Sequence, residues 1–172
     1  DMTGILINEF SASNATFEDE NGSLHDWIEL YNTNNYSVNI GGLYVTDSLG
    51  NPSKYRIPSH TPKLTTIPAK SFYILYADNK EMDEVNHTNF KLSRGGEQLG
   101  LVHYDQETIL DSISYSEQFK NSSLSRIAAS DQWVSIPPTP GESNLAPDLS
   151  ELVINEVMGS NKTSYCNANS EY

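Results

Sequence analysis

The chain of 172 residues carries 10 Lys and Arg against 23 Asp and Glu, which gives a formal net charge of −13 and a sequence pI near 4.5. A surface of this charge repels nucleic acid and anionic lipid, so we expect neither as a partner. With 37% hydrophobic residues the chain can bury a core. No apolar run approaches the ~18 residues of a membrane-spanning helix.

The apolar runs are short, and Gly, Pro, Asn, Asp and Ser separate them. Alternation of apolar and polar residues recurs, whereas no stretch sustains the i, i+3, i+4 spacing of a long helix. About nine or ten short strands without crossover helices predict an all-β, antiparallel β-sandwich. The clearest predicted strands, in chain order, are 5–10, 26–32, 43–46, 54–57, 71–77, 98–102 and 110–115.

Three of these segments allow finer predictions. In 26–32, the aliphatic Ile28 and Leu30 share one parity and are expected to face the core. The most hydrophobic segment, 71–77, is predicted to run through the middle of a sheet. Segments 89–92 and 98–102 are predicted to form a hairpin, with Gly95-Gly96 supplying a positive φ at its turn.

The opening segment occurs twice. Residues 152–161 (LVINEVMGSN) repeat residues 5–14 (ILINEFSASN) in register, at an offset of 147 residues. This spacing predicts a complete domain over residues 1–147, and a linker with the truncated start of a second copy over residues 148–172. Because the sequence begins at Asp1 without Met, we interpret it as an excised or processed fragment.

An ordered set of motifs resembles the lamin tail domain family, and its bacterial branch most closely. The resemblance covers nearly all of residues 4–144 and implies an immunoglobulin-like fold, with bacterial members attached as non-catalytic modules to secreted or surface proteins. The motifs are Ile7-Asn8-Glu9-Phe10 with Ser13-Asn14, Asp26-Trp27-Ile28-Glu29-Leu30-Tyr31-Asn32, Asn89-Phe90-Lys91-Leu92-Ser93, Gly96-Glu97 and Pro138-Thr139-Pro140-Gly141.

Polar residues around the first loop are the candidate binding residues. We favour a loop-ordering role for them, with Glu9 and Glu29 accepting hydrogen bonds from loop backbone or Ser13, because buried acids normally have such partners. Calcium prefers six to eight oxygen ligands, so a calcium site is the alternative. The loop-ordering set is Asn8, Glu9, Ser13, Asn14, Asp26 and Glu29, and the calcium set is Glu9, Asp19, Asp26 and Glu29.

No catalytic signature accompanies these residues, and we expect no enzymatic activity and no cofactor. The sequence contains neither Gly-x-Ser-x-Gly nor His-Glu-x-x-His, and its four histidines lie in separate segments. Trp27 and Trp133 are predicted to be core anchors. The tyrosines are expected to be half-buried strand residues, although they could instead form a stacking platform for sugars or peptides.

We therefore expect a non-catalytic interaction or spacer module of a larger extracytoplasmic protein, secreted or at the cell surface and bacterial. Its partner would be a protein or a glycan, besides the neighbouring domains of its own chain, including the second copy. The alternative is an accessory carbohydrate- or calcium-binding domain attached to a hydrolase or another enzyme.

Overall fold

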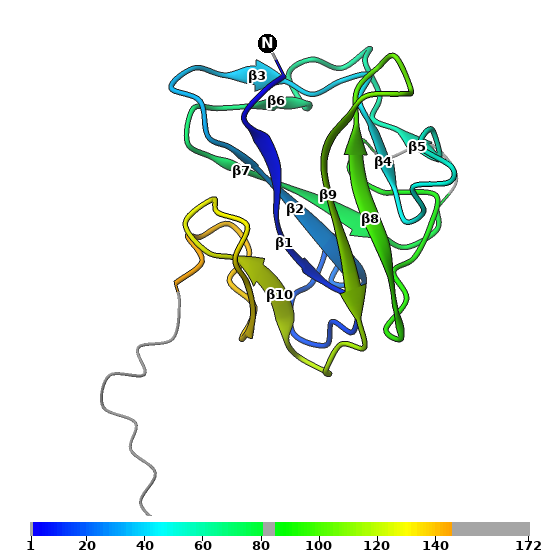
Figure 1. The fold of residues 1–172 in the computed structure, drawn as a ribbon, viewed down its shortest axis with the longest axis vertical. Coiled ribbons are helices and arrows are strands. Elements are labelled where there is room, and N and C mark those ends of the chain that lie inside the picture. Colours follow the sequence, from blue (N-terminus) through cyan, green and yellow to red (C-terminus); the bar gives the residue numbers. More distant parts are fainter. Residues whose placement is uncertain (1, 81–84, 146–172) are drawn as a thin grey trace, which may run out of the picture.

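The computed structural model describes residues 2–80 and 85–145, and these form an all-β fold (Figure 1). The predicted fold class is confirmed. Eleven strands replace the expected nine or so, because three of them, β3, β5 and β6, are only two residues long. Their bounds are β1 Ile5–Ser11, β2 Asp26–Asn32, β3 Val38–Asn39, β4 Tyr44–Thr46, β5 Tyr55–Arg56, β6 Thr66–Ile67, β7 Phe72–Ala77, β8 Gly96–Val102, β9 Ile109–Ser116, β10 Ser123–Arg126 and β11 Trp133–Ile136.

Two antiparallel sheets form the layers of a sandwich. The first has five strands in the order β11-β10-β1-β2-β7, and the second has four in the order β5-β4-β8-β9. A two-stranded piece, β3 with β6, stands beside them (Figure 1). β1 lies at the centre of the first sheet because it pairs with β2 on one side and β10 on the other.

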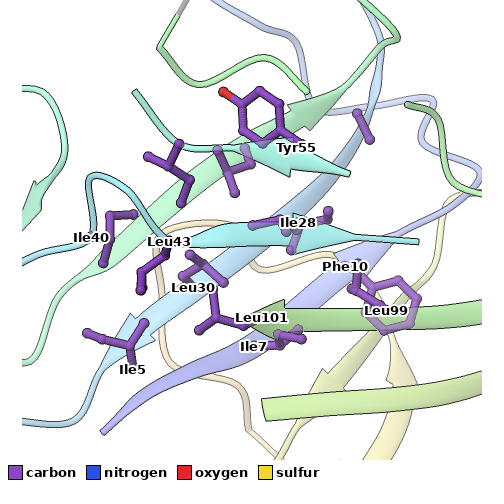
Figure 2. Close-up of a cluster of buried hydrophobic side chains, with 14 of the residues drawn as sticks. Ile5, Ile7, Phe10, Ile28, Leu30, Ile40, Leu43, Tyr55, Leu99 and Leu101 are labelled. Atoms are coloured by element: carbon purple, nitrogen blue, oxygen red, sulfur yellow. The ribbon is translucent and has the colours of Figure 1, made fainter. Parts of the chain in front are cut away.

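Aliphatic side chains from both sheets fill the space between them. Figure 2 shows Ile7 and Phe10 of β1 facing Leu99 and Leu101 of β8, with Ile28 of β2 in the same cluster. All five side chains are fully buried. The predicted parity of β2 is confirmed in this respect, since Ile28 and Leu30 both belong to the core.

An ion pair between Arg126 and Asp111 links the two sheets beside a bulge in β1. The register of β1 against β2 shifts between Ile7 and Glu9, which leaves Asn8 without a register partner on β2. The Ile7 N–H donates to Asp111 Oδ2 of β9 at 2.8 Å, and Arg126 Nε of β10 donates to the Ile7 carbonyl at 2.8 Å. Arg126 also binds Asp111 at 2.7 Å and lies over the ring of half-buried Trp133.

Two of the finer strand predictions are wrong. β7 lies at an edge of its sheet instead of the middle, and the segment after residue 85 covers part of that edge, with Tyr76 N–H donating to the Asn86 carbonyl at 2.7 Å. β8 forms its hairpin with β9 and not with residues 89–92. The positive φ is nevertheless present, at +105° on Gly96, where a Cβ would meet the Tyr115 carbonyl at 2.6 Å.

The predicted domain boundary at residue 147 and the second copy at 152–161 lie outside the described residues. Within these residues, no helix has the length and apolar character needed to span a membrane.

Candidate functional site

Three residues of β2 point away from the core. Because Ile28 and Leu30 face inward, strand alternation places Trp27, Glu29 and Tyr31 on the outer face of the five-stranded sheet. Trp27 lies under the first loop, Glu29 under the segment after β11, and Tyr31 in a hollow. Most of the predicted site residues lie on or beside this outer face.

The first loop (residues 12–25) covers Trp27. The Phe17 and Trp27 rings meet edge to face at a centroid distance of 5.7 Å, and Phe17 stacks on Tyr76 at 6.1 Å. Trp27 is fully buried, but it lies outside the hydrophobic core between the sheets. Its indole Nε1 has no hydrogen-bond partner among the described residues.

Asn14 holds the first loop in shape. Its Nδ2 donates to the carbonyls of Phe17 and His25 at 2.6 and 2.7 Å, and its Oδ1 accepts from the Thr16 and Phe17 N–H groups. Asp26 Oδ1 accepts from the Asn14 N–H at 3.4 Å. Burial raises the pKa of Asp26 to about 6, against the opposing effect of this hydrogen bond.

Glu9 and Glu29, which we name the carboxylate pair, lie directly opposite each other on β1 and β2. Both are fully buried under residues 137–144, which we name the C-terminal strap. Glu9 accepts from the N–H and the hydroxyl of Thr139, each at 2.9 Å. Glu29 accepts from the Gly141 N–H at 2.6 Å and from Asn8 Nδ2 at 2.7 Å.

Burial raises the pKa of Glu29 to about 7. Hydrogen bonds from Gly141 and Asn8 act in the opposite direction, and the like charge of Glu9 raises the pKa further. No cationic side chain forms an ion pair with Glu9 or Glu29 in the described part of the chain. The carboxylate pair is therefore stabilised by neutral donors from the strap and from Asn8.

The carboxylate pair orders a different segment from the one that the sequence suggested. We expected Glu9 and Glu29 to bind the first loop or Ser13, but both face the C-terminal strap, Glu29 by strand parity and Glu9 because of the bulge between Ile7 and Glu9. Ser13 lies beyond the end of β1, where its carbonyl accepts from the Asn121 N–H at 3.2 Å. Asn8 binds Glu29 instead of loop amides, and the Asn8 carbonyl accepts from Asn144 Nδ2 at 2.9 Å.

A second polar cluster, which the sequence did not predict, joins the first loop to the end of β7. We name Asp19, His25, Asp78 and His87 the histidine cluster. His87 Nδ1 lies 2.7 Å from Asp78 Oδ2, and His25 Nε2 lies 3.3 Å from Asp19 Oδ2. The His87 ring is almost fully buried.

The carboxylates of the histidine cluster have pKa values shifted downward, whereas the pKa of Glu29 is shifted upward. Burial tends to raise the pKa of Asp78, but hydrogen bonds from His87 and Lys80 outweigh it and hold that pKa below its ordinary value. The backbone N–H of Ser23 lowers the pKa of Asp19 against the effect of burial, helped by the Asn21 N–H and the nearby His25. Both acids are therefore stabilised as anions.

The predicted calcium set does not converge. Glu9 and Glu29 lie under the strap, Asp19 lies in the histidine cluster, and Asp26 lies beside Asn14. Within residues 2–80 and 85–145, no three His, Cys, Asp or Glu side chains are grouped so that they could hold a metal ion. The described residues thus do not form the four-carboxylate site.

The Tyr31 end of the outer face is open. A hollow of about 280 Å³ lies there, between the β10–β11 turn and the end of the C-terminal strap. Tyr31 and Phe72, directly opposite on β2 and β7, are half-buried in it and stack at a centroid distance of 4.8 Å. Sequence reasoning placed Tyr31 among many possible stacking residues and gave no reason to pair it with Phe72.

Two antiparallel sheets packed face to face, with loops fixed to the outer face by buried acids, define an immunoglobulin-like β-sandwich module. The family model of the Lamin Tail Domain matches residues 2–117. The chain belongs to the lamin tail domain family, and the matched domain is a non-catalytic module.

The match ends within the sequence that builds the sandwich. β10, β11 and the C-terminal strap follow residue 117, yet β10 pairs with the central β1 and the strap binds the carboxylate pair. Comparisons with curated proteins and with solved structures gave no match.

Proposed function

We propose that this chain is an interaction module of a larger secreted or cell-surface protein, and that it binds a protein or glycan partner through the outer face of its five-stranded sheet. The proposal rests on one observation: chain segments cover part of that face and leave another part open. Trp27 and Glu29 are fully buried under chain segments, whereas the stacked Tyr31 and Phe72 remain half-exposed in a hollow.

The buried acids of the outer face are engaged in structural hydrogen bonds, which supports a binding role over a catalytic one. The oxygens of Glu9 and Glu29 accept hydrogen bonds from Thr139, Gly141 and Asn8, so they hold structure in place. Catalysis needs a nucleophile and a base that meet at a site open to substrate. We therefore infer that these acids position the C-terminal strap, which borders the hollow.

Extracytoplasmic location is part of the same proposal. The net charge of −13 favours solubility and disfavours nucleic acid as a partner, and the motif of residues 5–14 recurs at 152–161. Repeated modules raise the effective concentration of binding sites on extended surface proteins. A spacer role is the second candidate, supported by the same repeat.

Biolayer interferometry with the immobilised chain tests the proposal, using panels of purified polysaccharides, extracellular matrix proteins and proline-rich peptides. We expect saturable binding in one panel and no turnover of nitrophenyl ester, phosphate or glycoside substrates. Turnover that purifies with the chain would contradict the non-catalytic proposal. No saturable binding in any panel would contradict the interaction role and support the spacer.

A further inference from the structure

We propose that the hollow at the Tyr31 end binds a sugar residue that carries a carboxylate, within an acidic oligosaccharide. This inference rests on the interaction role proposed above and assigns it a site and a ligand class. The aromatic pair Tyr31 and Phe72 would stack against the ring of the sugar, and Lys70 would face its carboxylate.

The aromatic pair provides the apolar part of the site. Tyr31 and Phe72 stack on each other, so each ring covers one face of the other, and the remaining ring faces and edges form the aromatic surface of the site. Both rings are half-buried, which holds them in place while leaving part of this surface open to the hollow. The C–H face of a pyranose ring packs on such a surface, because the aromatic face is negative and the C–H groups are weakly positive.

The charges of the lining select for an anion. The lining contains Lys70 and Arg126 but no Asp or Glu, in a chain with 23 acidic residues. The Arg126 guanidinium is neutralised by Asp111 at 2.7 Å. Lys70 Nζ donates to the Thr33 carbonyl at 2.5 Å and forms no ion pair with any described carboxylate. Lys70 is therefore the cation that is left to bind an anionic group.

Polar groups on the opposite side of the hollow can bind sugar hydroxyls. Asn8 Nδ2 is fixed by Glu29, which directs the Asn8 amide and leaves its Oδ1 as an acceptor. Ser143 brings a hydroxyl from the C-terminal strap, and this part of the strap is fixed by Asn144, whose Nδ2 binds the carbonyls of Asn8 and Arg126. The carboxylate pair thus acts on the site indirectly, by holding Asn8 and the strap.

The size of the hollow favours a sugar over a peptide. A volume of about 280 Å³ is near the lower limit for small-molecule sites and fits one or two pyranose rings. The turn at Ala128 and Ala129 and the strap border it, so it lacks the length of a groove for an extended peptide.

Isothermal titration calorimetry of the whole chain with tetragalacturonate tests the inference, with cellotetraose as the neutral comparison and a proline-rich peptide as the alternative ligand. We expect tetragalacturonate to bind more tightly than cellotetraose and to weaken in 0.5 M NaCl, because salt screens the contact with Lys70. Equal affinity for both sugars, no binding of either, or binding of the peptide alone would overturn it.

Matched variants locate the site. Tyr31→Leu and Phe72→Leu keep apolar volume while removing a ring, and each should weaken tetragalacturonate binding by about tenfold. Lys70→Gln should weaken it by about threefold and reduce the salt dependence. Tyr104→Leu and Lys120→Gln, at exposed positions outside the hollow, are the controls and should bind like the unaltered chain.

Thermal melting shows whether each variant is folded. If folded Tyr31→Leu and Phe72→Leu bind tetragalacturonate with unchanged affinity, the hollow is not the site. In that case the interaction role still stands, because the chain binds a glycan elsewhere. If the chain binds a protein from the interferometry panels but no acidic sugar, the sugar inference fails and the interaction role again stands.

Discussion

The carboxylate pair and the histidine cluster are both buried at the five-stranded sheet, yet the pKa values of Glu29 and Asp78 shift in opposite directions. Among the described residues, Glu29 accepts hydrogen bonds only from the neutral groups of Gly141 and Asn8, and its pKa rises to about 7. Asp78 accepts from His87 and Lys80, and its pKa falls. The comparison indicates that the hydrogen bonds and charges around a buried acid, as well as burial, decide whether it stays charged.

The largest expected effect is the pH dependence that comes from Glu29. Its pKa is about 7 in the folded chain against an ordinary 4.5, so the folded state binds the proton more tightly. The stabilisation is full below pH 4.5 and is lost as pH rises through 7, which amounts to about 3 kcal/mol. Urea unfolding at pH 4.5, 6 and 8 measures it.

Glu29→Gln isolates this effect. The variant should lose most of the decline in unfolding free energy between pH 4.5 and 8, while Glu107→Gln at an exposed site should keep it. Asp26, with a pKa raised to about 6, contributes a smaller decline in the same direction in both variants. An unchanged profile in Glu29→Gln would mean that Glu29 is not the titrating group.

The next largest effect is expected from Asp78→Asn. This change removes the charge that binds His87 and Lys80 and should lower the unfolding free energy at pH 7 by roughly 2–3 kcal/mol. Because the folded pKa of Asp78 is depressed, its contribution is present above pH 3.8 and is lost as pH falls further. The stability difference between variant and parent should therefore narrow toward pH 3, and a constant difference would contradict the assignment.

Thr139→Val tests how much the contact between the C-terminal strap and the carboxylate pair contributes to stability. It removes the hydroxyl that Glu9 accepts at 2.9 Å and keeps the Thr139 N–H and the shape of the side chain. We expect a loss of about 1–1.5 kcal/mol at pH 7 in chemical unfolding. Thr16→Val, at an exposed position of the first loop, is the control. Equal effects would mean that the Glu9 contact adds no stability.

The smallest effect is a gain in stability. Ala128 and Ala129 have φ of +50° and +53° in a turn closed by Ser130 N–H to the Ile127 carbonyl at 3.0 Å. Asn and Gly are the residues that this conformation favours, so Ala128→Asn should stabilise the chain by about 0.5–1 kcal/mol. A lower melting midpoint would contradict the assigned backbone conformation.

Local patterns predicted the parts of this fold that depend on alternation. The parity of Ile28 and Leu30 and the positive φ of Gly96 follow from strand period and turn chemistry. The edge position of β7 did not follow, because its apolar side chains are covered by loops and by the segment after residue 85 instead of by a further strand.

Long-range partners explain what the sequence could not predict at the candidate site. Glu9 and Thr139 are 130 residues apart, and His87 and Glu20 are 67 apart, so no local spacing relates them. Parity with Ile28 and Leu30 would have placed Glu29 on the outer face, but Glu9 shares the parity of the buried Ile5 and Ile7 and reaches that face through the bulge between Ile7 and Glu9. It could not show that the Pro-rich segment, read as the end of the domain, folds back over them.

A carbon-13 NMR titration of the side-chain carboxyl groups tests the central claim most directly, namely that these acids hold structural segments and that their hydrogen-bond partners, together with burial, set their ionisation. We expect Glu29 to titrate near pH 7 and Asp78 below its ordinary value of 3.8, in the same folded sample. Titration of Glu29 near 4.5 together with Asp78 near 3.8 would contradict it.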